Sequence, residues 1–179
     1  MKIGVMSDSH GETDHVREAG RFLTQELGVE LLIHLGDDEP DADVLRGLGP
    51  EVITIPGVFS DRYRDPEVTN RVRTAFGPWR VLLSHTPERH KYDLPEDPDP
   101  QALVRAGEID LLLHGHTHTP FVSEKGGVVI VNPGHLRSSD KKGHHASFAC
   151  LDVQGRQLEV TVYSLTTKSV LHNEVFTRP

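Results

Sequence analysis

Cysteine is nearly absent from this sequence, since Cys150 is the only one among 179 residues. A lone cysteine excludes an internal disulfide and a zinc site built from several thiolates. The surrounding segment, residues 147–153, is typical of a β-strand. We therefore expect Cys150 to be a small buried apolar residue rather than a reactive thiol.

Long hydrophobic runs are also missing, because no stretch approaches the roughly 18 apolar residues of a membrane helix. Residues 1–3 lead directly into a strand-like segment rather than into a secretory signal peptide. These features predict a cytoplasmic protein that does not associate with membranes.

Positively charged residues are fewer than negatively charged ones: the sequence has 19 Lys and Arg against 27 Asp and Glu, for a formal net charge of −8. An acidic chain is poorly suited to wrap a nucleic acid through its phosphates, so extended nucleic-acid binding is not expected. A phosphate group can still be bound locally where a metal ion or a few arginines supply a positive field.

What the sequence does contain is typical of one globular α/β domain over residues 1–179, with 36% hydrophobic and 26% charged residues. Strand-like and helix-like segments alternate in the first half, whereas the second half has strands without long helices between them. The sequence thus predicts one domain with two sheets. The expected strands are 2–6, 30–35, 52–55, 79–83, 109–114, 121–122, 128–131, 147–153, 158–164 and 170–176, and the expected helices are 13–27, 41–48 and 101–106.

Two histidines follow the apolar strand Leu111-Leu112-Leu113-His114, directly after Gly115. If the chain stays extended there, His116 and His118 point the same way, because side chains alternate along a strand. Two imidazoles that converge from one short segment suit a metal ion.

Potential metal ligands follow four of the expected strands. In open α/β sheets, ligands gather beyond the carboxyl ends of the strands, so we expect these side chains to meet. Two carboxylates and four imidazoles exceed the needs of one tetrahedral ion and suit two ions about 3.5–4 Å apart that share a carboxylate and a hydroxide. Such donors without thiolate favour Mn²⁺, Fe, Zn²⁺ or Ni²⁺ over Mg²⁺. The six residues are Asp8, His10, Asp37, His85, His116 and His118.

The order of these motifs resembles that of the calcineurin-like metallophosphoesterases, most closely their small phosphodiesterase branch. The resemblance spans residues 2 to about 153 and implies a four-layer αββα sandwich of two mixed β-sheets flanked by helices. It also implies a phosphodiesterase that hydrolyses a phosphate-ester small molecule or nucleotide with a metal-bridging hydroxide. The motifs are Asp8-Ser9-His10-Gly11, Gly36-Asp37, Ser84-His85, Gly115-His116-Thr117-His118 and the late Val131-Asn132-Pro133-Gly134.

The resemblance further implies how the ligands divide between two divalent ions per chain, with Mn²⁺ expected and Fe, Zn²⁺, Ni²⁺ or Mg²⁺ as alternatives. A first ion takes four side chains, and Asp37 bridges it to a second ion. The first set is Asp8, His10, Asp37 and His118, and the second is Asp37, His85 and His116.

One segment departs from the family pattern. Members usually have Gly-Asn followed by His, Cys or Asp, where the Asn binds the second metal and the His, in many members, assists the leaving group. This chain has Val58 and Phe59 there, which can do neither. Either Ser60 or Asp61 substitutes as a ligand, or the second ion is held weakly.

The leaving-group proton then needs another donor, and His90 and His135 are the candidates, since histidine is best suited to this role near neutral pH. We expect His34 to be a hydrogen-bonded core residue, and residues 88–100 to form a loop over the site. The competing hypothesis is a scaffold protein that kept the fold but lost efficient catalysis. An exposed edge strand in the second half would also allow two chains to pair.

Overall fold

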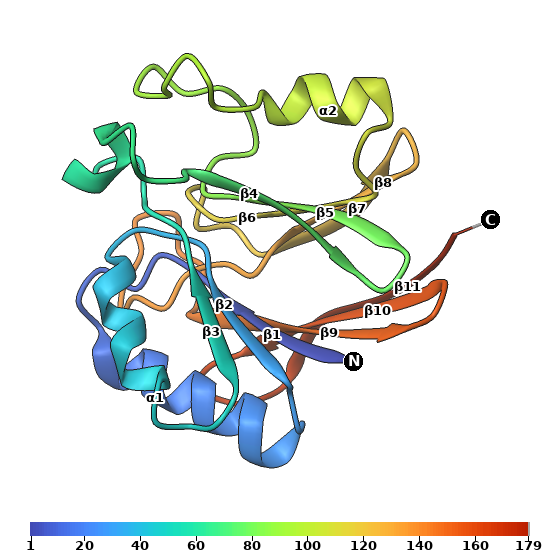
Figure 1. Ribbon diagram of the computed structural model, residues 1–179. Coiled ribbons are helices and arrows are strands. Elements are labelled where there is room, and N and C mark those ends of the chain that lie inside the picture. Colours follow the sequence, from blue (N-terminus) through green and yellow to red (C-terminus); the bar gives the residue numbers. More distant parts are fainter. Residues whose placement is uncertain (179) are drawn as a thin grey trace.

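Two β-sheets pack face to face in the computed structural model, which describes residues 1–178 (Figure 1). The first sheet has six strands in the order β11-β10-β9-β1-β2-β3. Strands β1, β2 and β3 run parallel, and β9, β10 and β11 extend the sheet in antiparallel fashion. The bounds are β1 (Lys2–Met6), β2 (Leu31–His34), β3 (Glu51–Thr54), β9 (Ser147–Gln154), β10 (Gln157–Ser164) and β11 (Val170–Thr177).

The second sheet has five strands in the order β4-β5-β6-β8-β7 and is also mixed. Strands β5, β6 and β8 are parallel, whereas β4 and β7 pair antiparallel at the two edges. The bounds are β4 (Arg71–Phe76), β5 (Trp79–Ser84), β6 (Leu111–His114), β7 (Phe121–Lys125) and β8 (Val128–Asn132).

Helices cover the outer face of each sheet, so the molecule has four layers (Figure 1). Helix α1 (Thr13–Arg21), the π-helical turn η1 (Phe22–Glu26) and the 3₁₀ helix η2 (Glu39–Leu45) lie on the six-stranded sheet, and α2 (Pro100–Ala106) lies on the five-stranded one. A short 3₁₀ helix, η3 (Asp61–Arg64), follows β3. The expected sandwich of two mixed sheets flanked by helices is confirmed.

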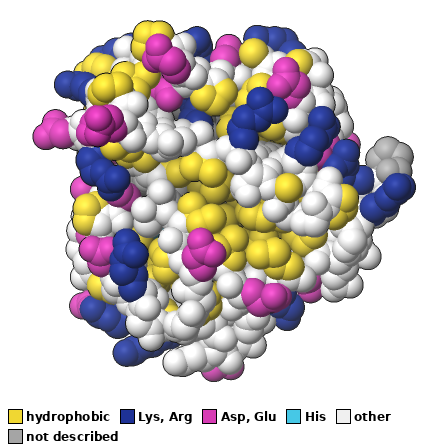
Figure 2. Space-filling view, viewed as in Figure 1, with side chains coloured by type: hydrophobic (Ala, Val, Ile, Leu, Met, Phe, Trp, Pro, Cys, Tyr) yellow, Lys and Arg dark blue, Asp and Glu magenta, His cyan; other side chains and the backbone are white. Residues whose placement is uncertain are grey.

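The position of β6 between two layers explains why this strand has no polar face. In β6, Leu111 and Leu113 pack between the two sheets, whereas Leu112 packs under α2. Because both faces of the sheet are covered, consecutive apolar residues are all buried, as is usual for parallel strands between helices and a second layer. In Figure 2, acidic and basic side chains are interspersed over one face of the molecule, and apolar ones show along its middle.

Three local predictions need correction. The strand β4 was not predicted, because its arginines and partly exposed residues hide an edge strand from a hydrophobicity pattern. The helix expected at 41–48 is the 3₁₀ helix η2 and starts earlier, after Asp38 in the left-handed conformation. The second half, whose strands without long helices between them predict antiparallel pairing, also contains a parallel pair, since β8 runs parallel to β6. No helix within residues 1–178 combines the length and apolar character needed to cross a bilayer.

Candidate metal centre

The carboxyl ends of β1, β2, β5 and β6 meet at one edge of the sandwich and bring the six predicted ligands together. They form two clusters, in each of which one candidate ligand atom per residue lies within 4.8 Å of the others. Asp37 belongs to both clusters. The first contains Asp8, His10, Asp37 and His118, and the second contains Asp37, His85 and His116.

The backbone at these strand ends is turned rather than extended. Strand β6 ends at His114, and both His116 and His118 have positive φ, 65° and 58°. The expectation that an extended segment points them the same way is therefore wrong, and they contribute to different clusters. Asp8, His10 and Asp37 have positive φ as well, from 50° to 56°. Non-glycine residues adopt this conformation at a penalty of about 1 kcal/mol or more, and such strain gathers at functional sites.

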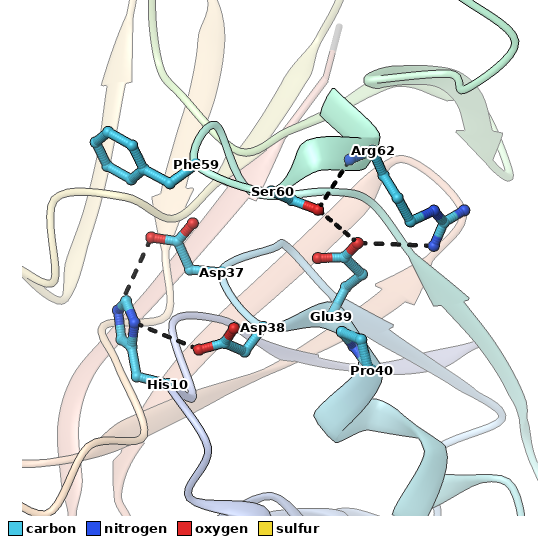
Figure 3. Close-up of a pocket in the computed structure, with 8 residues that line it drawn as sticks. All are labelled: His10, Asp37, Asp38, Glu39, Pro40, Phe59, Ser60 and Arg62. Carbon is cyan, nitrogen blue, oxygen red and sulfur yellow. Dashed lines mark hydrogen bonds and ion pairs between the residues drawn. The ribbon is translucent and has the colours of Figure 1, made fainter. Parts of the chain in front are cut away.

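Atoms in the first cluster face one another at distances that suit a shared cation. His10 Nε2 lies 3.8 Å from Asp37 Oδ2 (Figure 3). The same nitrogen is 3.2 Å from His118 Nε2. His118 Nε2 is 3.3 Å from Asp8 Oδ1. A cation among these atoms would accept the lone pairs that the converging imidazoles direct at each other.

In His85 and His118, a hydrogen bond from Nδ1 fixes the ring and leaves Nε2 available to bind an ion. His85 Nδ1 donates to Leu35 O at 2.7 Å, which leaves Nε2 directed at Asp37 Oδ1, 3.3 Å away. His118 Nδ1 donates to Asp140 Oδ1 at 2.9 Å. Metal-binding histidines are typically oriented in this way by a carbonyl or a carboxylate. Asp140 was not predicted, because it lies in a charged loop with no motif around it.

Buried polar atoms without a partner support the fit to a cation. Asp8 and His85 are fully buried, and Asp8 Oδ1 and His85 Nε2 have no hydrogen-bond partner within residues 1–178. Buried polar atoms are normally satisfied, so each unpaired one needs an explanation such as an ion. Oxygen and imidazole donors without thiolate match a borderline divalent metal such as Mn²⁺, Fe²⁺ or Zn²⁺.

The charges of the clusters are arranged to receive a cation. Burial by itself raises the pKa of Asp8, but the imidazoles of His118, 3.3 Å away, and of His85 outweigh it and lower that pKa to about 2. Burial lowers the pKa of His85, yet the facing carboxylate of Asp37, 3.3 Å away, and that of Asp8 raise it overall. Burial lowers the pKa of His116. Ionised carboxylates thus face protonatable imidazoles, and a bound cation would displace the protons.

Two glycines make room for the carboxylates. A Cβ on Gly57 would lie 1.9 Å from Asp37 Oδ1, and one on Gly115 would lie 1.9 Å from Ser7 Oγ and 2.5 Å from Asp8 Oδ2. Such distances are far below van der Waals contact. The loops after β3 and β6 therefore approach the ligands closely because these positions carry no side chain.

The segment that departs from the family pattern supplies no further ligand. Val58 is fully buried, and Asp61 is exposed at the start of η3 and belongs to neither cluster. Ser60 Oγ donates to Glu39 Oε1 at 3.2 Å and accepts from Arg62 N. The prediction that Ser60 or Asp61 replaces the missing Asn thus finds no support in the geometry, and the second cluster keeps three candidate ligands.

The two candidate proton donors occupy different settings. His135 is fully buried, its Nδ1 accepts from Arg137 N at 3.1 Å, and its Nε2 faces His144 O at 3.1 Å. Both nitrogens are engaged with the main chain, which argues against a role for His135 in proton transfer. His90 is half-buried, and its ring centroid lies 5.9 Å from that of His116.

Comparison with known proteins places the geometry in context. A family model described as the calcineurin-like phosphoesterase superfamily domain matches residues 1–156. Phosphodiesterase YfcE from Escherichia coli K12 is 28% identical over 172 residues, which cover 85% of this chain and 88% of that protein. A probable metallophosphoesterase from Methanothermobacter thermautotrophicus is 33% identical over 140 residues, which cover 75% and 76%.

Solved structures share the fold over nearly their whole length. A predicted phosphoesterase from Streptococcus pneumoniae TIGR4 has a TM-score of 0.72 at 22% identity, with 99% of this chain and 97% of that chain covered. Vps29 from Chaetomium thermophilum has a TM-score of 0.73 at 20% identity, with 99% of each chain covered. At these identities the likeness concerns the fold alone.

Proposed function

Because the chain belongs to the calcineurin-like phosphoesterase superfamily, we propose that it is a phosphodiesterase that uses two divalent metal ions. The observation that carries this proposal is the pair of clusters that share Asp37. One carboxylate common to both sets would hold two ions close together, and such a pair would supply an activated water. Mn²⁺ is the metal we expect, with Fe, Zn²⁺, Ni²⁺ or Mg²⁺ as alternatives.

The protein's own residues set up the reaction. Asp8, His10, Asp37 and His118 would hold one ion, and Asp37, His85 and His116 would hold the other. Two bound ions lower the pKa of a water between them and neutralise charge on the phosphate oxygens during in-line attack. Leu35 O and Asp140 keep His85 and His118 in the tautomer that presents Nε2 to an ion.

His90 is the residue we propose for protonating the leaving alcohol. Its ring lies beside His116, and its Nε2 has no hydrogen-bond partner within residues 1–178. The loop that carries it is anchored, since His90 N donates to Asp93 Oδ2 at 2.9 Å. A half-buried imidazole next to the reacting centre suits general acid catalysis near neutral pH.

The proposal is tested by metal content and turnover together. Protein purified without chelator is analysed for bound metal, and hydrolysis of bis-p-nitrophenyl phosphate is measured during Mn²⁺ titration. We expect about two ions per chain and turnover that depends on Mn²⁺, with both lost in Asp37→Ala because that residue serves both clusters. Unchanged metal-dependent turnover in Asp37→Ala would contradict the proposal.

Val58 leaves the second ion with three protein ligands, so the two ions should bind with unequal affinity. We expect Val58→Asn to tighten the weaker binding step by about tenfold, because an amide oxygen adds one ligand. Isothermal titration with Mn²⁺ measures both steps. Val52→Asn, a half-buried position in β3, is the control and should leave the two affinities unchanged. An unaltered second step in Val58→Asn would mean that this side chain does not reach the ion.

A second candidate function follows from Val58, which supplies no ligand to the second cluster. If three ligands hold the second ion too weakly for catalysis, the protein acts as a binding module that retains the fold. Bound metal at one ion or fewer per chain, with no turnover at any Mn²⁺ concentration, would support this alternative over the phosphodiesterase.

A further inference from the structure

A cavity of about 360 Å³ opens beside the first cluster and contains polar groups that the proposed chemistry does not use. Figure 3 shows its lining, with Glu39, Ser60 and Arg62 grouped on one side and His10 and Asp37 on the other. We propose that this cavity is a specificity subsite that binds the vicinal diol of a ribonucleoside ester. The inference rests on the proposed function in taking the phosphate to lie on the ions.

The cavity lies directly beside the candidate metal clusters, where the proposed reaction takes place. His10 and Asp37 line the cavity and also belong to the candidate metal clusters. An ester whose phosphorus lies at the ions must direct one of its two alcohol groups into neighbouring space. This cavity is such a space, and its volume of about 360 Å³ is large enough for a group of sugar size.

Glu39 is the polar centre of the cavity. It is only 5% exposed, and its Oε1 accepts from Ser60 Oγ at 3.2 Å and pairs with Arg62 Nη1 at 3.6 Å. Its other oxygen, Oε2, has no hydrogen-bond partner within residues 1–178. A buried carboxylate with an unused acceptor is a strong hydrogen-bond site for a hydroxyl donor.

Arg62 supplies the complementary donor. Its side chain is 61% exposed, and its contact with Glu39 leaves most of its five N–H groups free. A carboxylate that accepts from one hydroxyl, beside a guanidinium that donates to the next, suits two adjacent hydroxyl groups. The positive charge of Arg62 is neutralised by Glu39, and Asp38 adds a further negative charge to the lining. The cavity therefore favours a neutral polyol over a second phosphate.

Phe59 favours a nucleoside over a simple glycerol ester as the source of the diol. This side chain lines the cavity, yet it is 68% exposed, and its ring lies 6.3 Å from that of His116. An exposed aromatic face beside a polar subsite is a common platform for stacking a base. The ribose would thus face Glu39 and Arg62 while the base lies against Phe59.

The test is a binding comparison that does not depend on turnover. Calorimetry with Mn²⁺ present compares AMP with 2′,3′-dideoxy-AMP, which carries the same phosphate and base. We expect the dideoxy compound to bind at least about tenfold more weakly, the effect of losing hydrogen bonds to charged groups. Equal affinities would overturn the inference.

Variants identify the residues responsible. Glu39→Gln and Arg62→Ala should each bring the ratio of the two affinities towards one, and Arg62 lies on the surface, so its replacement does not threaten the fold. Arg46→Ala is the matched control: that side chain is 67% exposed, is paired with Asp43, and lies outside the cavity. A ratio that stays high in both Glu39→Gln and Arg62→Ala would place the diol elsewhere and overturn the assignment.

Two further measurements separate the possible failures. Glycerol 3-phosphate binding as tightly as AMP, with no effect of Phe59→Ala on AMP, would overturn the ribonucleoside as source. Hydrolysis of bis-p-nitrophenyl phosphate is followed in parallel on the wild-type protein. Turnover without diol discrimination refutes the subsite alone, whereas diol discrimination without turnover supports the subsite and refutes the phosphodiesterase.

Discussion

At the scale of single residues, the clusters depend on groups that never reach an ion. Asp140 is such a positioning residue, because its Oδ1 holds Nδ1 of His118 at 2.9 Å and so frees Nε2 for the cluster. The nearby carboxylate of Asp8, and after it the hydrogen bond to Asp140, raise the pKa of His118. Without the carboxylate of Asp140, the imidazole is free to rotate or to change tautomer.

We expect Asp140→Asn to weaken Mn²⁺ binding by about 10- to 100-fold, the usual effect of losing such a supporting carboxylate. Competition with a fluorescent chelator measures the affinity. The control is Asp43→Asn, which removes an exposed carboxylate that is paired with Arg46 and belongs to neither cluster. Equal metal affinity in Asp140→Asn and the wild type would show that His118 needs no such support.

His34 belongs to the core, as predicted, and makes the fold sensitive to acid. It is fully buried, and its Nε2 lies 3.1 Å from Ser9 Oγ. Burial lowers its pKa from 6.5 to about 4. Since the unfolded chain takes up a proton near pH 6.5 and the folded chain does not, stability falls as the pH drops from 6.5 towards 4.

His34→Gln keeps a polar group near Ser9 and removes the titration. Between pH 7 and pH 5 we expect metal-free wild type to lose about 2 kcal/mol more unfolding free energy than this variant. Urea unfolding in the presence of chelator measures both. The comparison between the two proteins cancels the opposite contribution of His85 and His118, whose pKa values are raised. Identical losses would mean that His34 is not neutral in the folded state.

The candidate metal ligands could be predicted from their motifs, whereas the residues that position them or line the neighbouring cavity could not. The six candidate ligands follow apolar strands in a fixed order, so sequence alone indicates that they meet. Asp140 lies in a loop and Glu39 at the start of η2, and the position of each depends on distant contacts, such as that between Ser60 and Glu39. The turned backbone at His116 and His118 was also missed, because nothing in a His-Thr-His spacing indicates positive φ.

At the scale of elements, the edge strand β4 anchors the loop next to the site. Arg71 in this strand is fully buried at its side chain and pairs with Asp93, 1% exposed, at 2.9 Å. The same guanidinium donates to Pro98 O and Glu88 O, and Asp93 accepts from Tyr63 Oη at 2.6 Å. The buried ion pair between Arg71 and Asp93 thus attaches the loop at 88–100, which is expected over the site, to strand β4.

Loss of the Arg71–Asp93 ion pair should lower the free energy of unfolding far more than loss of the Arg73–Glu108 pair. Arg71→Leu removes the buried counter-charge of Asp93 and leaves it only the half-exposed Arg89, whose Nε is 3.8 Å away, so we expect a loss of about 3–5 kcal/mol. Arg73, two residues along β4, pairs with Glu108 where both side chains are about half exposed, and Arg73→Leu should cost less than about 1 kcal/mol. Chemical unfolding measures both. Similar losses in the two variants would contradict a structural role for the buried pair.

At the scale of the whole molecule, the candidate metal centre joins the two sheets. Asp8, His10 and Asp37 follow strands of the six-stranded sheet, whereas His85, His116 and His118 follow strands of the five-stranded one. Each cluster draws ligands from both sheets. An ion bound there therefore links the two halves of the sandwich at one edge, so that metal binding and folding are coupled.

Thermal unfolding should report this coupling directly. A ligand that binds only the folded state at about 1,000 times its Kd stabilises it by about 4 kcal/mol. For a chain of this size each kcal/mol raises Tm by about 2–4 °C, so saturating Mn²⁺ should raise Tm by about 10 °C over chelator-treated protein. Asp37→Asn should abolish most of the rise, because Asp37 serves both clusters, whereas Asp43→Asn should retain it. A full rise in Asp37→Asn would mean that the stabilising ions bind outside the clusters and do not link the sheets at this edge.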